Sequence, residues 1–181
     1  MPLLVAMFLV LFGGMFQASA EQDIATLRNA AEHGDAMAQY RVGLSYAMGN
    51  GVPQDDRQAI PWYKKAADQD NASSQVSLGL MYAEGRGVPQ DDEQAAIWYK
   101  KSAEQGDMKA QYNLAFMYRN GRGVPQDDVN AYIWYSLAAA QGQVNAANGR
   151  DLAASQFSPE QRSKAQAQAV EFQSKINKQK K

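Results

Sequence analysis

The sequence contains no cysteine and a single histidine in 181 residues. Without cysteine the chain has no disulfide, no thiolate nucleophile and no thiolate metal ligand. His33 alone cannot form a zinc site of several histidines, and a Ser-His-Asp triad would have to use that one residue. These absences predict a protein with no metal site and no cofactor.

An excess of positive charge is also missing. The 18 Lys and Arg residues are balanced by 19 Asp and Glu residues, which gives a formal net charge of -1. A protein that binds nucleic acid by neutralising phosphates normally carries a strong basic excess, so no nucleic-acid partner is expected. Hydrophobic residues make up 45% of the chain, which is typical of a globular protein and excludes extensive disorder.

An uncharged apolar run occupies Leu3–Phe16 near the start of the chain. It is shorter than the roughly 20 residues of a membrane-spanning helix, and its length suits the core of a secretory signal peptide. Ala18–Ala20 then places small residues where signal peptidase reads them. We interpret residues 1–20 as a signal peptide, which predicts a periplasmic or secreted protein of a Gram-negative envelope without stable membrane insertion after cleavage. An uncleaved anchor is the alternative, because no Lys or Arg precedes the run.

A unit of 36 residues repeats along the chain, and a fixed period of this length is the signature of a repeat protein. The segment Gly-Val-Pro-Gln-Asp-Asp recurs at this spacing, and so does a Trp-Tyr pair. The segment begins at Gly51, Gly87 and Gly123, and the pair begins at Trp62, Trp98 and Trp134. Three full units therefore cover residues 36–71, 72–107 and 108–143.

Each unit contains two stretches with helical periodicity, which we call its first and second helix. In the second unit, Ser74, Leu78 and Tyr82 share one face of the first helix. Trp98 and Ser102 share one face of the second helix in the same way. The pattern predicts an all-α fold, a right-handed α/α superhelical solenoid of helix-turn-helix repeats.

Small and turn-forming residues fit this arrangement of helices. Gly49 and its equivalents end the first helices as left-handed residues, and Pro53 and its equivalents prevent their continuation. Either Asp55 or Asp56, with the equivalent pairs, caps the second helix. Gly79 and its equivalents allow a neighbouring helix with large aromatic side chains to approach closely.

These motifs resemble the Sel1-like repeat family, a relative of the tetratricopeptide repeats. The resemblance rests on Leu78-Gly79 with Tyr82, on the Gly-Arg-Gly-Val loop at Gly85, and on the Trp-Tyr-Lys-Lys-Ser-Ala helix of residues 98–103. It implies an α/α solenoid that binds other proteins and is not an enzyme.

Incomplete repeats flank the three units. Residues 21–35 carry the register of a second helix and are interpreted as an N-terminal half repeat. Residues 144–181 are interpreted as C-terminal capping helices with a basic tail, the last helix starting with Ser158 as N-cap and Pro159 as its first residue. Atypical end units are expected because a terminal repeat must present one face to water.

The first full unit is expected to be the least regular of the three. Pro61 lies inside its second helix, where it removes a backbone hydrogen bond. Asp70 stands where the other units have a glycine, at a position that requires a left-handed backbone.

Several motifs could suggest chemistry but have simpler structural interpretations. The Asp-Asp pairs occur once in each repeat, as helix caps would, and the Gly-Arg-Gly-Val loops lack the Lys-Ser/Thr ending of a phosphate-binding loop. His33 is interpreted as a solvated residue at a helix end, and the lysines at the C-terminus as a solvated tail. None of these motifs predicts catalysis.

The first helices carry a second face opposite the stripe that packs on the second helices. The resemblance to tetratricopeptide-related repeats implies that the first helices line a concave groove. Because this first-helix face also differs between units and is more apolar than a solvated surface, we predict that it binds another protein, with the chain itself a monomer. The alternative is that its apolar residues pack in the core. The predicted binding residues are Met37, Tyr40, Arg41, Leu44, Met48, Val76, Ser77, Leu80, Glu84, Lys109, Tyr112, Asn113, Phe116 and Asn120.

The resemblance implies a more specific role. Exported bacterial members of the family suggest an adaptor, a regulator or an immunity protein that blocks a secreted toxin. One alternative is a β-lactam-binding or β-lactam-hydrolysing enzyme like the cysteine-rich branch of the family, although this chain lacks the cysteines of that branch. A peptidoglycan-associated structural spacer is the other alternative.

If residues 1–20 are a cleaved signal peptide, protein purified from an envelope fraction should begin at Glu21. Intact-mass spectrometry checks this, because the uncleaved chain is heavier by the whole segment. A mass that retains Met1 would identify the segment as an anchor or as part of the fold.

Overall fold

The computed structural model describes residues 24–179, and every regular element in this range is an α-helix. The predicted all-α class is therefore confirmed for the described part of the chain. The signal peptide predicted for residues 1–20 and the last two lysines of the basic tail lie outside the described residues. Within residues 24–179, no helix combines the length and the hydropathy that crossing a bilayer requires. The chain divides into two units, one ending at Asn71 and one beginning at Ala72.

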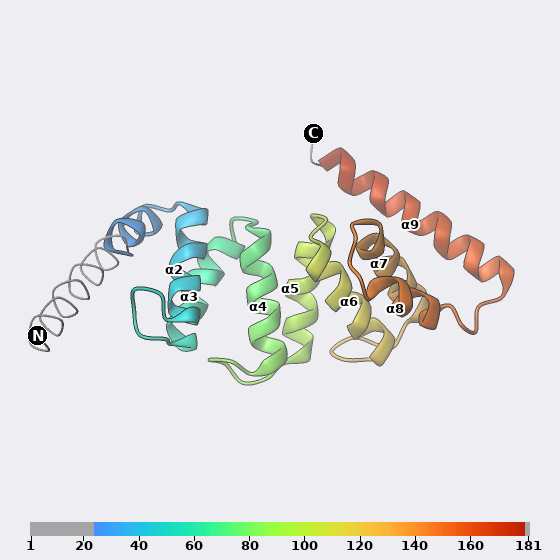
Figure 1. Ribbon diagram of the computed structural model, residues 1–181, viewed down its shortest axis with the longest axis horizontal. Helices are drawn as coiled ribbons and strands as arrows, with labels where there is room; N and C mark the ends of the chain where they lie inside the picture. Colours follow the sequence, from blue (N-terminus) through green and yellow to red (C-terminus); the bar gives the residue numbers. More distant parts are fainter. Residues whose placement is uncertain (1–23, 180–181) are drawn as a thin grey trace, which may run out of the picture. The chain divides into compact units, whose positions relative to one another are not determined.

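The first unit contains α2 (Ala36–Met48) and α3 (Asp56–Ala67), which pack against each other (Figure 1). Helical residues 24–32 precede them. Ala31, Ala38 and Val42 form a buried cluster in this unit, and Trp62 of α3 packs against it. Ile24 and Leu27 contact the same cluster, as their register predicts.

The second unit contains six helices in sequence order. The first four form two packed helix-turn-helix pairs, α4 with α5 and α6 with α7, and α5 also contacts α6. Their core is continuous from α5 to the last helix. The helices are α4 (Ala72–Glu84), α5 (Asp92–Glu104), α6 (Met108–Asn120), α7 (Asp128–Ala140), α8 (Ala146–Ala153) and α9 (Pro159–Gln179).

Glycines on the first helices receive the tyrosine rings of the second helices. A Cβ atom at Gly79 would lie 2.6 Å from a ring carbon of Tyr99, and one at Gly43 would lie 2.7 Å from a ring carbon of Tyr63. No side chain fits at such a distance, so only glycine allows the two helices to approach this closely. The predicted packing of small residues against large rings is confirmed at both positions.

Buried glutamines add a hydrogen bond to each helix pair. The glutamine of the first helix accepts a bond of 2.8 Å from a glutamine amide at the end of the second helix. Two of these glutamines also donate to the second helix before them, at 3.0 Å to the carbonyl of Ala31 and at 3.2 Å to that of Ala103. The hydrogen-bonded pairs are Gln39 with Gln69, Gln75 with Gln105, and Gln111 with Gln141.

The first aspartate of each Asp-Asp pair is the helix cap, which decides between the two predicted candidates. Asp91 accepts a bond of 3.0 Å from the backbone N–H of Gln94, and the carboxylates of Asp55 and Asp127 cap α3 and α7 in the same way. The second aspartate is the first residue of its helix, where its negative charge faces the positive helix end. Gly49, Gly85 and Gly121 all adopt the predicted left-handed conformation, with φ of 73°, 69° and 62°.

Both predicted departures of the first full unit occur. Pro61 lies within α3 and the helix continues past it. Among the described residues, Asp70 is the only one other than glycine with a positive φ, at 60°. A short polar side chain tolerates this conformation better than most residues, so the chain turns here without glycine.

The last helix begins as predicted. The hydroxyl of Ser158 accepts a bond of 3.1 Å from the N–H of Gln161, whose side chain accepts one of 2.9 Å from the N–H of Ser158. This reciprocal arrangement is a capping box, and Pro159 occupies the first helical position.

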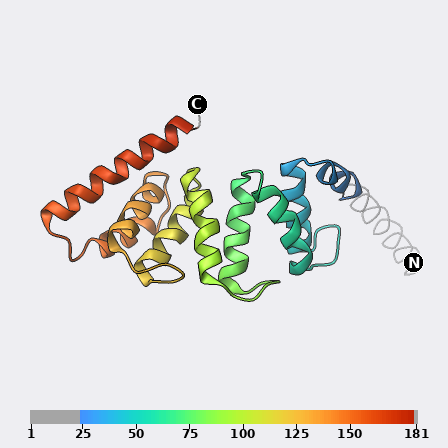
Figure 2. The ribbon, with the colours of Figure 1, turned by 180° about the vertical axis from the view of Figure 1, so that it is seen from behind.

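The last helix, α9, packs against α7 instead of completing a fourth repeat with α8 (Figures 1 and 2). In α5 the ammonium group of Lys101 lies 4.3 Å from the ring centroid of Trp98. In α7 the equivalent tryptophan, Trp134, instead meets Phe172 of α9, with ring centroids 5.3 Å apart. Leu137 replaces the lysine and is buried. The first two units have a Lys-Lys pair after Trp-Tyr, and the third unit has Ser136-Leu137 instead. The packing of α9 on this part of α7 explains the replacement.

Replacing Asp91 with alanine should lower the free energy of unfolding by about 1 kcal/mol, because the N–H of Gln94 loses its acceptor. Glu93 also lies in the first turn of α5 but is exposed, so Glu93→Ala should cost about 0.5 kcal/mol or less. Urea denaturation of the two variants measures the difference. Stabilisation of the wild-type protein by calcium or zinc, absent from Asp91→Ala, would show that the aspartate binds a metal.

Candidate protein-binding surface

The predicted first-helix face is exposed or half-buried throughout, and none of its fourteen residues is buried. In the first unit, α2 exposes Met37 and Met48. In the second unit, α4 exposes Leu80 and α6 exposes Phe116, whose exposed fraction is 42%. Leu114, two residues before Phe116, is 1% exposed. Each first helix therefore has one stripe that packs in the core and one apolar stripe that does not.

The aromatic residues of this face divide into two groups. Tyr40 packs against Tyr63 with ring centroids 5.9 Å apart, and Tyr112 packs against Tyr135 at 5.6 Å. Both first-helix tyrosines are half-buried, so they belong partly to the core. Phe116 is exposed, and the alternative that placed it in the core is therefore wrong for this residue.

The second-helix tyrosines contact the next first helix in the chain. The side chain of Asn113 on α6 lies close to the phenol of Tyr99 on α5. Burial, assisted by the nearby carboxylate of Glu84, raises the pKa of Tyr99, and the neighbouring Asn113 and Arg122 oppose this shift. Burial, followed by the neighbouring Tyr112, raises the pKa of Tyr135 to about 12. Both phenols are therefore neutral at physiological pH, and their rings act in packing.

Other polar residues of the face also bond within their own helices. The hydroxyl of Ser77 donates to the carbonyl of Ser73 at 2.9 Å, and the amide of Asn120 donates to the carbonyl of Phe116 at 2.7 Å. Lys109 on α6 and Arg41 on α2 are exposed. The face thus combines apolar side chains with equal numbers of charged and uncharged polar residues, the charged ones being Arg41, Glu84 and Lys109.

Leu152 on α8 is a surface residue that the sequence interpretation missed. It is 56% exposed and stands 36 residues after Phe116, which itself stands 36 residues after Leu80. The repeat period could have identified it, but the rest of the repeat pattern is weak around α8. We call Leu80, Phe116 and Leu152 the apolar column of the second unit.

The repeat loop of the third unit has a structural role. The guanidinium of Arg122 donates two hydrogen bonds to Asp92, of 2.8 and 3.2 Å. A Cβ atom at Gly123 would lie 2.0 Å from the backbone oxygen of Asp92, so this loop packs directly on the start of α5. Arg122 and Asp92 thus connect the second and third repeats and are not arranged as a phosphate site.

Residues with the potential for metal binding or catalysis are dispersed. Within residues 24–179, no three His, Asp or Glu side chains form a group that could hold a metal ion. His33 lies at an exposed helix end, with Nδ1 2.8 Å from the carbonyl oxygen of Asn29, as its interpretation as a helix-end residue requires.

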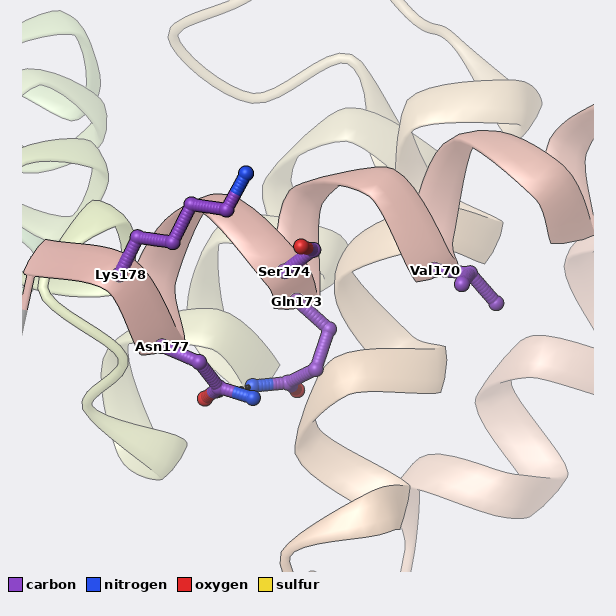
Figure 3. A pocket seen from close by; sticks show the side chains of 5 residues that line it. All are labelled: Val170, Gln173, Ser174, Asn177 and Lys178. Carbon is purple, nitrogen blue, oxygen red and sulfur yellow. Dashed lines mark hydrogen bonds between the residues drawn. The ribbon is translucent and has the colours of Figure 1, made fainter.

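An open hollow of about 450 Å³ lies along α9. Figure 3 shows its lining, which includes Val170, Gln173 and Lys178. The amide of Gln173 donates to the side chain of Asn177 at 3.0 Å. These residues come from one helix and include no pair of catalytic groups, so the hollow is not the candidate site.

A helical-repeat scaffold with an exposed apolar face is the class of protein that the fold and this surface define. The Sel1 repeat family model matches residues 36–71, 72–107 and 109–143, which together are more than half of the chain. The chain belongs to the Sel1 repeat family. Proteins of this family are generally protein-interaction modules, and their fold is typically a non-catalytic binding scaffold.

Three solved structures are similar to this chain. A Sel1 repeat protein from Oxalobacter formigenes is 39% identical over 72% of this chain and 98% of its own, with a TM-score of 0.66. The protective antigen c5321 of uropathogenic Escherichia coli is 27% identical over 84% of this chain, which spans 41% of that protein, with a TM-score of 0.56. Cysteine rich protein B of Helicobacter pylori shares the fold at 19% identity over 71% of this chain and 96% of its own, with a TM-score of 0.58. No significant match was found among curated proteins.

The two stripes of α6 should respond differently to truncation. Leu114→Ala should cost about 2–5 kcal/mol of stability, because it removes a buried side chain and leaves a cavity. Phe116→Ala should cost about 1 kcal/mol, because its ring is already partly in water. Thermal and urea unfolding measure both values. Equal losses would show that Phe116 is a core residue and would remove it from the binding surface.

Proposed function

We propose that the protein is a non-catalytic binding module of the bacterial cell envelope that holds a partner protein on its first-helix face. Phe116 carries the proposal, because its ring is 42% exposed on α6 at the position that Leu80 occupies on α4. An exposed aromatic anchor surrounded by ordered polar groups is typical of an interface hot spot. Neither side chain is required to fill the core.

Variation among the repeats supports the same function. The loop segment Gly-Val-Pro-Gln-Asp-Asp, which ends in the helix cap, is the same in all three units. The first-helix face instead changes from Tyr40 to Val76 to Tyr112, and from Glu84 to Asn120. Identical residues maintain the scaffold, whereas the variable residues form a surface suited to one particular partner.

The proposed location in the envelope is supported by the apolar run and the small residues that follow it within residues 1–20. In that compartment the module would act as an adaptor, as a regulator, or as an immunity protein that blocks a secreted toxin. These roles share one requirement, which is stoichiometric binding of another protein.

Purification of the tagged protein from the periplasm of the bacterium that produces it tests the function. A partner protein should co-purify stoichiometrically with the wild type, and its affinity should fall about thirtyfold in Phe116→Ala. Val170→Ala removes an exposed apolar side chain of α9 and should bind normally. Recovery of cell-wall fragments in place of a protein would contradict the proposal. Equal affinity of the partner for the wild type, Phe116→Ala and Val170→Ala would also contradict it.

A further inference from the structure

We propose that α8 is the contact surface for a second copy of this chain, and that two copies pair about a two-fold axis beside their α8 helices. This inference goes beyond the proposed function, because it concerns self-association and does not require the first-helix face to bind a partner. The monomer predicted from the sequence is then the state of the dilute protein.

Helix α8 has the position of a first helix but lacks a second helix of its own. Gly149 on α8 stands 36 residues after Asn113 on α6, and a Cβ atom there would lie 2.7 Å from a ring carbon of Tyr135. Asn113 lies close to the equivalent tyrosine, Tyr99. Helix α8 therefore packs on α7 as α6 packs on α5. The second helices of their own repeats also cover α4 and α6, whereas α9, which follows α8, packs on α7.

The sequence of α8 explains why no second helix packs there. Leu78 of α4 and Leu114 of α6 are buried, and a small residue follows each of them. The equivalent positions on α8 are Arg150 and Asp151, which form an ion pair accessible to water. Charged groups lose hydration when an apolar helix covers them, which is unfavourable. The side of α8 that carries this pair is therefore left without a covering helix in a single copy.

Exposed apolar side chains adjoin this ion pair. Leu152 follows the pair directly and is 56% exposed, and Val144, two residues before α8 begins, is 86% exposed. We call Val144, Arg150, Asp151 and Leu152 the α8 surface. Contact with another protein surface would remove both apolar side chains from water, which contributes favourable free energy in proportion to the area buried.

The charges of the α8 surface select a second copy of the same surface. Arg150 directs both Nε and Nη2 at Oδ1 of Asp151, at 3.0 and 2.9 Å. Its Nη1 and the Oδ2 of Asp151 form no hydrogen bond with the described residues. A two-fold axis can place Arg150 of each copy beside Asp151 of the other, so that no like charges have to meet. A partner of uniform charge would attract one member of the pair and repel the other.

The size of the surface sets the strength of the contact. Helix α8 has eight residues and is therefore about 12 Å long. Two such helices bury less than the roughly 1,200–2,000 Å² of a stable protein interface, so the dimer should be weak. We expect a dissociation constant on the order of 100 μM and a dimer that forms only in concentrated protein.

Sedimentation velocity of the protein purified from the envelope fraction tests the dimer, at concentrations from about 10 μM to about 1 mM. The mean mass should rise with concentration toward that of two chains. Leu152→Ala should weaken the dimer at least about fivefold, because both copies lose an apolar contact. Val170→Ala removes an exposed apolar side chain of α9 and should leave the dimer unchanged.

Charge reversal gives a sharper test of the two-fold contact. Arg150→Asp places two carboxylates on each α8 surface, and Asp151→Arg places two guanidinium groups there, so each variant alone should stay monomeric at about 1 mM. An equimolar mixture of the two variants should form a mixed dimer, because the two surfaces then carry opposite charges. Circular dichroism of each variant checks that its helices are retained.

Each result bears on the α8 contact. A wild-type protein that stays monomeric at about 1 mM would overturn the proposal. Dimers that persist in both charge variants would place the contact elsewhere, and a mixture of folded variants that stays monomeric would exclude the charge pairing. None of these outcomes affects the proposed function, which is tested through Phe116.

A measurement on the wild-type protein covers the case in which the variants do not fold. The NMR methyl signals of Val144 and Leu152 should shift as the protein is concentrated, whereas those of Val170 should not. Shifts at Val170 without shifts at Leu152 would overturn the proposal.

Discussion

The contact between a second-helix tyrosine and the first helices on either side of it is the constraint on which the rest of the second unit depends. Tyr99 fits against Gly79 of its own repeat, where a Cβ atom would come within 2.6 Å of its ring, and its phenol lies close to Asn113 of the next repeat. Tyr135 likewise meets Tyr112 and Gly149. A single buried side chain thus determines both the distance within a repeat and the register between repeats.

This arrangement separates stability from recognition on each first helix. The packing stripe buries residues such as Leu78 and Leu114 and is held further by the glutamine pairs, so it tolerates little change. The exposed residues of the opposite face, such as Leu80 and Phe116, contribute little to the core, and they differ among repeats without disturbing the scaffold. A repeat protein can therefore acquire a specific binding surface while the loops, caps and ring contacts remain the same.

The C-terminal end follows the same physical rules with a different result. A regular second helix would pack on α8, yet α9 lies on α7, where Phe172 meets Trp134 and Leu137 is buried. Ser136-Leu137 in place of the Lys-Lys pair made α7 apolar enough to be covered. The cap therefore shields the last complete repeat and leaves Leu152 exposed.

The helices, their caps, the left-handed glycines and the two faces of each first helix could all be predicted from the sequence. Local backbone chemistry and the 36-residue period determine these features, as the capping by aspartate and the positive φ of Asp70 illustrate. The partners of the buried glutamines and the half-burial of Tyr112 were decided only by tertiary structure. The docking of α9 on α7 was also decided by tertiary structure. All of these features depend on which side chains meet when helices that are distant in sequence pack together. The local pattern of residues along the chain does not specify those contacts.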